Sequence, residues 1–410
     1  GRHERGFNFQ DEFGEDLALA RNTRDEEPPK TPRGLHGGGQ GYPVSPKIPL
    51  QDDLHDPAKE RYDEGTSASQ FLASLATVSV ALTIYFYEAA SYNIIFLGRI
   101  LPARDKAALI LPFGVIFNLV WCLAIWSYLQ AHLSDPGTVP RRWRDFARSL
   151  GDALPVAPPR LEWQPGKATW CKKCCIPRPE RAHHCHVCGI CVLRMDHHCP
   201  YIFNCVGFNN HKHFLLLIVY TTAACSIVLL TALPDFLYYV YVLLDVQEET
   251  PLHASELWGF LISCVLDILL LLVLAPMVPA HITLARRNQT SIEGNYNNMP
   301  NPFDQGEVQA NLQQLFGAYG PDWFFPVPPL RRVSDGVSFP KADEDEADVE
   351  PELSDKDLGE EGTEKQSERL WRMRYGVRRL HSPDRGQGAL GSPRQPSGPL
   401  DAIALWWRSL

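Results

Sequence analysis

Long uncharged apolar blocks alternate with polar segments along the chain. Each block is long enough to cross ~30 Å of hydrocarbon as a helix. The alternative, buried helices in a large soluble core, fits these lengths poorly. The pattern therefore predicts an all-α integral membrane protein with a four-helix bundle, two spans within residues 67–134 and two within 214–285. The blocks are Gly65–Tyr87, Ala107–Ser134, Phe214–Leu233 and Leu257–Ala285.

Polar residues dominate both ends of the chain. Of its 410 residues, 21% are charged and 45% are apolar, values that resemble a soluble protein only because they average the blocks with these ends. Residues 1–66 are rich in glycine, proline and charge, and we expect them to be disordered. We expect the same of a tail over 326–410, which carries an acidic run from Asp343 to Glu364. The basic stretch Arg369–Leu380 is either a short amphipathic helix on anionic membrane or part of a loose tail.

Basic residues indicate how the spans are oriented. The segment Ser134–His213, between the second and third spans, holds twelve Lys and Arg, whereas the third-to-fourth connection holds none. The positive-inside rule then places this segment and both termini in the cytosol. The net charge of -9 argues against nucleic acid as the main partner.

One acidic residue, Asp267, falls inside the fourth block. An exposed carboxylate there would cost ~2.5–3.5 kcal/mol on insertion scales, so the side chain should face the bundle or water. A proton or ion relay is one interpretation. We favour a hydrogen bond between helices, because a single acidic residue makes no pathway.

Cysteines and histidines gather between the second and third blocks. Eight of the eleven cysteines lie from Cys171 to Cys205, which favours metal binding in a reducing compartment over a disulfide scaffold. Cysteines separated by two residues let both thiolates hold one tetrahedral metal, and two closed zinc sites would need eight ligands. The segment offers more than eight, so spacing leaves their partition open. The histidines are His183, His184, His186, His197, His198, His211 and His213.

The same segment contains a longer motif. From Cys171 to Cys205 it reads Cys-x2-Cys-x9-His-Cys-x2-Cys-x2-Cys-x4-Asp-His-His-Cys-x5-Cys. Three further motifs are Asp135-Pro136-Gly137 after the second block, Thr290-Ser291-Ile292-Glu293 after the fourth, and a later segment that contains Asn311. Over roughly residues 67–320 the chain resembles the DHHC-type protein S-acyltransferases, the palmitoyltransferases, with C-terminal family motifs at 286–325.

This resemblance implies a cytosolic cysteine-rich domain at 135–213 with two structural Zn²⁺ ions. Their ligands would be Cys171, Cys174, His184 and Cys191 for one ion, and Cys185, Cys188, His198 and Cys205 for the other. Four protein ligands leave an ion no open position for catalysis. Cys199 would then be free as the nucleophile, with His197 as its base and Asp196 orienting His197. The implied reaction is ping-pong, from palmitoyl-CoA through a Cys199 thioester to a cysteine of a protein substrate.

The acyl chain and the CoA head group need different surroundings. Exposing a palmitoyl chain costs ~0.8 kcal/mol per CH2, so the resemblance implies an apolar cavity among the spans and a cytosolic CoA site. We expect Ala223 and Ala224 to leave that cavity deep, and Arg178 and Arg181 to hold CoA phosphates. A solvated basic face near anionic lipid is an equal alternative for the arginines. The expected partners are membrane lipids, long-chain acyl-CoA and proteins with membrane-proximal cysteines, in Golgi or ER membranes.

Some positions depart from the family pattern. Tyr201 stands where the family has Trp, Phe203 where it has Asn, and Ser291 where it has Thr. Cys175 matches no ligand position and is either an inert surface thiol or a self-acylated site. The alternative functions are a membrane-anchored zinc-binding scaffold and a catalytically silent family member. Both are disfavoured, because the ligand sets are complete without Cys199.

Overall fold

The computed structural model describes residues 68–244, 251–296, 300–341 and 360–377. Four helices within these ranges are long and apolar enough to cross a membrane, in agreement with the hydrophobic blocks. These candidate spans are Leu72–Ala103, Ala107–Leu133, His211–Leu244 and Ala254–Arg286. Residues 1–66, and the acidic run from Asp343 as far as residue 359, lie outside the described residues.

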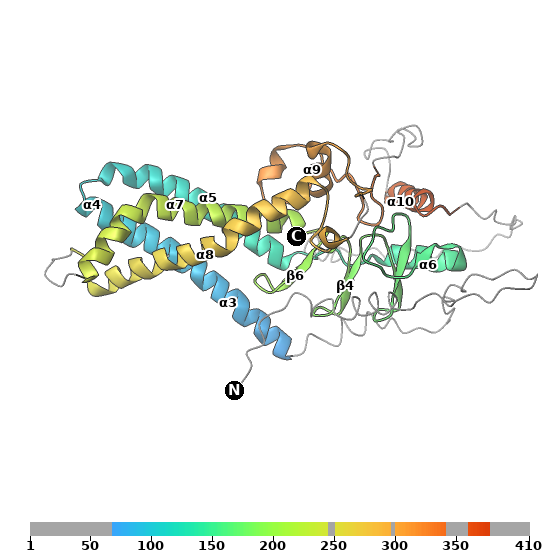
Figure 1. Ribbon diagram of the computed structural model, residues 1–410, viewed down its shortest axis with the longest axis horizontal. Coiled ribbons are helices and arrows are strands. Elements are labelled where there is room, and N and C mark those ends of the chain that lie inside the picture. The colour runs from blue at the N-terminus through green and yellow to red at the C-terminus, as the bar shows by residue number, and fades with distance from the viewer. Residues whose placement is uncertain (1–67, 245–250, 297–299, 342–359, 378–410) are drawn as a thin grey trace, which may run out of the picture. The chain divides into compact units, whose positions relative to one another are not determined.

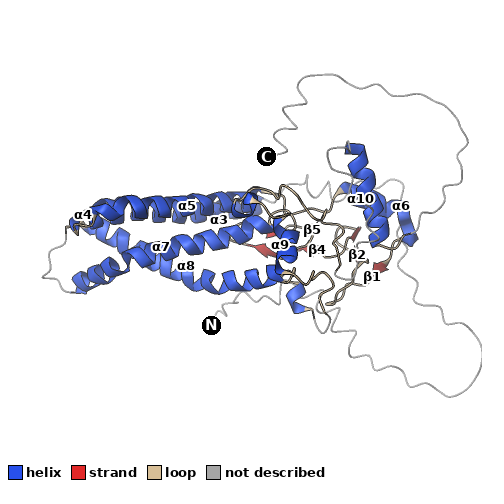
Figure 2. Cartoon of the chain, turned by 90° about the horizontal axis from the view of Figure 1, so that it is seen from above, coloured by secondary structure: helices blue, strands red, loops and turns tan. Residues whose placement is uncertain are grey.

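The spans are built mostly from single long helices. The first joins α3 (Ala68–Ala90), the π-helical η1 (Ser91–Ile100) and α4 (Leu101–Ala103). The second joins η2 (Ala107–Leu109) and α5 (Ile110–Leu133), and the others are α7 (His211–Leu244) and α8 (Ala254–Arg286). Helix α7 packs against both α5 and α8, and the three lie side by side in Figures 1 and 2. Helix α7 continues through Pro234, so the third span extends past the apolar block that predicted it.

Polar side chains join the spans to one another inside an aromatic core. The hydroxyl oxygens of Ser91 and Ser263 lie 2.7 Å apart, and those of Tyr92 and Thr231 lie 2.9 Å apart. Such hydrogen bonds and close packing hold helices together in a bilayer, where lipid removes the hydrophobic drive. The large buried side chains around these bonds are Tyr92, Phe96, Phe117, Tyr239 and Phe260.

Asp267 faces the interior of the bundle, as predicted, with 1% of its surface exposed. It lies beside Glu88 of α3 and Cys225 of α7. The carboxyl of Asp267 thus faces side chains of two other helices, and its inward orientation avoids the cost of a lipid-exposed charge.

The cysteine-rich domain is built from short strands, so the all-α prediction is wrong for this segment. After the helix α6 (Arg141–Leu150), a three-stranded sheet pairs β1 (Val156–Ala157), β2 (Ala168–Cys171) and β3 (Ile176–Arg178) in that order. Two antiparallel hairpins follow, β4 (His183–Cys185) with β5 (Ile190–Val192), and β6 (His197–Cys199) with β7 (Asn204–Val206). The tight Cys-x2-Cys turns suit hairpins better than helices, because both thiolates must reach one ion.

The C-terminal part contains more structure than the disordered tail predicted over 326–410. After η4 (Glu293–Asn295) come α9 (Val308–Phe316) and η5 (Pro321–Phe324), and residues 326–341 continue as described loop. A helix α10 (Glu360–Arg374) then packs on α6, with Trp371 and Tyr375 buried. The basic stretch from Arg369 is thus neither a membrane-surface helix nor a loose tail as far as Val377, because its aromatic face is covered by α6.

Candidate active site and metal centres

Two groups of cysteine and histidine side chains converge in the cysteine-rich domain. The first group is Cys171, Cys174, His184 and Cys191. Nδ1 of His184 lies 3.3 Å from the sulfur of Cys174 and 3.8 Å from that of Cys191. Ligands at ~2.3 Å (S) and ~2.0 Å (N) around one tetrahedral ion stand roughly 3.5 Å apart. The group therefore has the spacing of one metal site.

The second group repeats this arrangement one hairpin further along the chain, with Cys185, Cys188, His198 and Cys205. Nδ1 of His198 lies 3.3 Å from the sulfur of Cys188 and 3.7 Å from that of Cys205. His184 and Cys185 are neighbours in the chain yet belong to different groups, because adjacent residues of a strand point to opposite faces. The two groups thus interleave in the order that the family resemblance implies, and both can hold a metal ion.

Cys199 belongs to neither group. It ends strand β6 with 5% of its surface exposed, and it packs in an apolar cluster that includes side chains of the spans. His197 stands two residues earlier on the same strand, so both side chains point to one face of the hairpin. His198, between them, points to the other face and joins the second metal group.

His197 connects Cys199 to a buried carboxylate. Nδ1 of His197 donates a hydrogen bond to Oδ2 of Asp196 at 2.6 Å. Burial alone would lower the pKa of His197, but its hydrogen bonds with Asp196 and Cys199 outweigh this effect and raise the pKa to about 10. An imidazole held this way is a strong proton acceptor.

Asp196 is fully buried and held from several sides. The backbone N–H of Ser291 donates to Oδ1 at 2.8 Å and its hydroxyl donates to Oδ2 at 2.9 Å. Burial acts to raise the pKa of the Asp196 carboxyl, yet the nearby His211 and His197 hold it well below its usual range. Asp196 is therefore suited to remain an anion that orients His197.

Two histidines from the candidate spans also approach Asp196. Nε2 of His211 lies 3.9 Å from Oδ1 of Asp196, and Nδ1 of His281 lies 4.0 Å from Oδ2. His281 is not among the predicted site residues. The signal in the sequence is a polar histidine inside an apolar block, near the end of the block that precedes Arg286.

Arg181 is mostly buried and paired with Glu293, which leaves little of its guanidinium for the expected contact with CoA phosphates. Its side chain is 2% exposed, and Nε and Nη2 donate to the two carboxylate oxygens of Glu293 at 2.7 and 2.8 Å. The guanidinium also donates to the backbone oxygen of Asn288 at 2.8 Å. Removing one partner of a buried pair such as this costs about 3–5 kcal/mol, because the other charge stays buried and unpaired.

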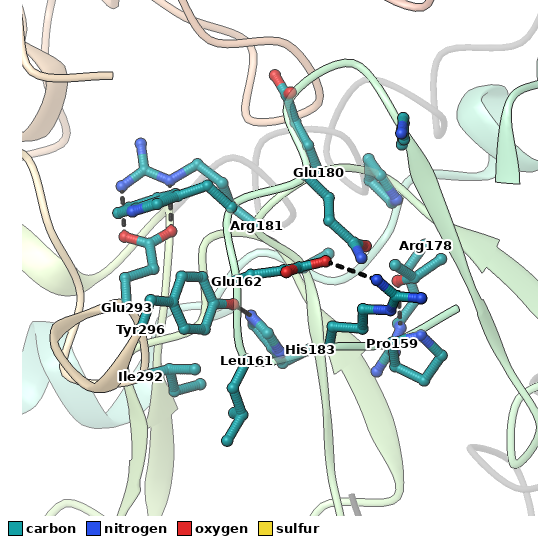
Figure 3. Close-up of a pocket in the computed structure, with 17 residues that line it drawn as sticks. Pro159, Leu161, Glu162, Arg178, Glu180, Arg181, His183, Ile292, Glu293 and Tyr296 are labelled. Atoms are coloured by element: carbon teal, nitrogen blue, oxygen red, sulfur yellow. Dashed lines mark hydrogen bonds and ion pairs between the residues drawn. The ribbon is translucent and has the colours of Figure 1, made fainter. Parts of the chain in front are cut away.

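Arg178 and Arg181 both line a pocket at the surface of the cysteine-rich domain, and both are mostly buried (Figure 3). Nε of Arg178 donates to Oγ1 of Thr169 at 3.1 Å. Arg160 and Lys167 also belong to the lining, where Arg160 pairs with Glu162 at 3.2 Å. The ion pair of Arg181 with Glu293 borders the pocket. Lys167 and Arg178 are the basic side chains of this lining that lie outside those two ion pairs, and they offer positive charge to an anionic group.

The remaining motif residues hold elements of the structure together. The Asp135 carboxylate accepts the N–H groups of Gly137 and Thr138 at 2.7 and 2.8 Å, forming a turn after the second span, and the Pro136 carbonyl accepts the N–H of Asn209 at 3.2 Å. Gly137 has a φ of 108°, which a residue with a Cβ rarely adopts.

Asn311 and Thr290 have comparable local roles. The amide nitrogen of Asn311 donates to the carbonyl of Arg286 at 3.0 Å, which ties α9 to the end of α8. The N–H of Thr290 donates to Glu293 at 2.9 Å, closing the turn that presents Ser291 to Asp196. Both residues therefore position the segment that follows the fourth span.

The two alanines predicted to line the acyl cavity, Ala223 and Ala224, lie on α7. Ala224 is buried in the aromatic core of the spans, whereas Ala223 is half-buried. One turn before them, the hydroxyls of Thr221 and Tyr85 lie 2.7 Å apart and join α7 to α3.

Comparisons with known proteins agree on one family. The family profile of DHHC palmitoyltransferases matches residues 164–298. Probable protein S-acyltransferase 13 of Arabidopsis thaliana is 34% identical over 216 residues, which cover 52% of this chain and 70% of that protein. Probable protein S-acyltransferase 12 of the same plant is 30% identical over 305 residues, covering 71% and 99%. Palmitoyltransferase ZDHHC3 of Rattus norvegicus is 37% identical over 151 residues, covering 37% and 47%.

Proposed function

The chain belongs to the DHHC palmitoyltransferase family, enzymes that transfer palmitate to cysteine side chains, and from this premise we propose that Cys199 carries the acyl group. The observation that supports this role most is the position of the Cys199 thiol. It lies beside His197 and outside both cysteine–histidine groups, in apolar surroundings next to the spans.

The proposed reaction proceeds in two acyl transfers. In the first, His197 takes the proton of the Cys199 thiol, and the thiolate attacks the carbonyl carbon of palmitoyl-CoA. The C–S bond to CoA breaks, CoA leaves as a thiol after receiving the proton, and a Cys199 thioester remains. In the second, His197 takes the proton of a substrate cysteine, whose sulfur attacks the thioester and releases Cys199. Asp196 keeps the proton of His197 on Nδ1, so that Nε2 is available to the thiols.

We propose that both cysteine–histidine groups hold Zn²⁺ with a structural role. Three thiolates and one imidazole are a usual ligand set for zinc. Such an ion fixes the fold of the hairpins, and with four protein ligands it has no open position for a substrate. All proton transfers therefore fall to His197, which Asp196 orients.

The acyl chain is proposed to lie among the spans, near Ala224. Replacing Ala224 with phenylalanine would fill space there, so the preferred acyl-CoA should become shorter, whereas Ala223→Phe, at a half-buried position, should change it less. Competition between tagged acyl-CoAs of different length for labelling of the protein measures the preference. An unchanged preference in Ala224→Phe would place the acyl chain elsewhere.

The pocket that Arg178 lines is proposed as the site of the CoA phosphates. Arg178→Ala should raise the KM for palmitoyl-CoA roughly ten-fold, since a hydrogen bond to a charged group contributes about 1.5–3 kcal/mol, and kcat should change little. Arg148→Ala is the control, because Arg148 is an exposed arginine of α6 that pairs with Asp145. Equal KM values for Arg178→Ala and the wild type would mean that this pocket does not bind the CoA phosphates.

The orientation of the spans and the compartment of the protein are also proposed. We propose that both termini and the domain at 135–213 face the cytosol, that 67–134 and 214–285 cross the membrane and 286–325 hold the C-terminal motifs, and that the protein resides in Golgi or ER membranes. Substrate proteins then present cysteines close to the membrane surface. Protease protection of terminal tags in sealed vesicles, with organelle markers, tests the orientation and the compartment. Protected termini would contradict this topology.

The experiment that tests the function is acyl labelling of the purified full-length protein. Incubation in detergent with tagged palmitoyl-CoA should give a label that hydroxylamine releases, because a thioester is cleaved by this reagent and an amide is not. A thiol substrate added afterwards should remove the label and carry it. Protein that never takes label would favour the alternative of a membrane-anchored zinc-binding scaffold or a silent family member.

A further inference from the structure

The helix α10 docks on the cysteine-rich domain through aromatic side chains. Trp371 is 3% exposed, and its ring centroid lies 5.7 Å from that of Trp143 and 5.3 Å from that of Phe146, both on α6. Tyr375, one turn further on, lies 4.9 Å from Trp143. One face of the C-terminal helix is therefore buried against the domain that carries Cys199, although none of the motifs or catalytic steps described above includes it.

A buried ion pair anchors the end of this helix. Nε of Arg374 donates to Oε1 of Glu180 at 2.8 Å, and Nη2 donates to Oε2 at 2.9 Å, with side chains 4% and 1% exposed. Glu180 also accepts the backbone N–H groups of Gly166 and Phe339 at 2.8 and 3.2 Å. The hydroxyl of Tyr375 accepts the N–H of Glu180 at 2.9 Å. Residues of α10 and its end thus fix both the side chain and the backbone of Glu180.

The residue that follows Glu180 leads to the catalytic carboxylate. Arg181 has a left-handed backbone, with φ at 61°, and its guanidinium binds both oxygens of Glu293. Ser291, in the same turn as Glu293, donates twice to Asp196. A continuous series of buried contacts therefore runs from Arg374 to the carboxylate that orients His197.

We propose that α10 is a positioning element for acyl transfer, which acts through Glu180, Arg181 and Glu293 on Asp196. The inference rests on the proposed roles of Cys199 and His197. Arg374 touches no reacting atom; it restrains Glu180, and through the backbone it restrains the neighbouring Arg181. Without Arg374, Glu180 loses two charge-assisted hydrogen bonds, and the turn that holds Ser291 can shift. A misplacement of ~1 Å at a catalytic group is enough to lower a rate about a hundred-fold.

The test compares Arg374→Ala with Met373→Ala in the detergent-solubilised full-length protein. Met373 is the preceding residue on α10 and is 50% exposed, so its truncation controls for a change in the helix itself. Arg374→Ala should lower kcat roughly ten-fold, while the KM for palmitoyl-CoA changes by less than about two-fold. The melting temperature of Arg374→Ala should fall, because Glu180 stays buried without its charge partner, but metal content and the folded fraction at the assay temperature should stay close to those of Met373→Ala. Arg374→Lys, which keeps the charge without the planar fork, should recover part of the rate.

A double-mutant cycle with Glu293→Gln tests the route. If Arg374 acts through Glu293, adding Arg374→Ala to Glu293→Gln should lower kcat no further. The inference is overturned by fully multiplicative effects, by equal rates for Arg374→Ala and Met373→Ala, or by a loss of activity that only follows a loss of metal and folded protein. A wild-type protein that takes no acyl label would instead overturn the function of Cys199, and the inference with it.

Discussion

Replacing Cys199 with serine should abolish acyl labelling by tagged palmitoyl-CoA while leaving both bound zinc ions in place. A serine hydroxyl is a far weaker nucleophile than a thiolate toward a thioester, and His197 alone is not a strong enough base to ionise it. Serine is nearly the size of cysteine, so the buried position leaves no large cavity. Gel detection of the label, with and without hydroxylamine, and metal analysis of the same sample measure both effects.

Cys175→Ser is the matched control for this change. Cys175 is an exposed thiol of the same domain and belongs to neither metal group, so the variant should label like the wild type. If Cys199→Ser keeps a hydroxylamine-sensitive label, the acyl group is carried by another thiol. If it loses one zinc ion, Cys199 is a ligand, and the anchored scaffold is the better description. A label lost only in Cys175→Ser would identify that residue as the acylated site.

Replacing one zinc ligand should be still more damaging than replacing the nucleophile. In Cys205→Ser we expect release of both ions, unfolding of the hairpins and loss of labelling. The apparent free energy of a structural zinc site in finger peptides is about 10–16 kcal/mol, as large as the whole stability of a typical domain at about 5–15 kcal/mol. His184 and Cys185 are adjacent and bind in different groups, so disorder at one site reaches the other directly.

The loss of metal and of folded structure in Cys205→Ser is measured by metal analysis, limited proteolysis and thermal denaturation. Cys175→Ser again provides the control, because it changes a thiol without changing a ligand group. A Cys205→Ser protein that keeps one full equivalent of zinc and resists protease would mean that the two groups fold independently. That result would contradict the coupling expected from the interleaved ligands.

The spans could be predicted from the sequence because their length and lack of charge suffice to define them. The inward orientation of Asp267 followed from the same energy argument. The partition of metal ligands could not be derived from spacing, since it depends on strand alternation, which sends His184 and Cys185 to opposite faces. Only the family resemblance supplied it.

Two parts of the structure could not be predicted from the sequence, because they depend on contacts between residues that are far apart in the chain. Arg181 resembled a phosphate ligand in the sequence, but its partner Glu293 lies 112 residues away and removes it from solvent. The tail from residue 326 had the composition of a disordered segment, and the partners of Trp371 are aromatic residues of α6, in a different part of the chain. Local composition carries no information about such pairs.

The burial of Cys199 among side chains of the spans has a consequence for acceptor choice. If Cys199 carries the acyl group, its buried sulfur is accessible to a flexible segment of a substrate that is held next to the spans. The choice of substrate would then depend on how close a cysteine lies to the membrane and not on a consensus sequence around it. Proteins of unrelated sequence could accept the acyl group equally well.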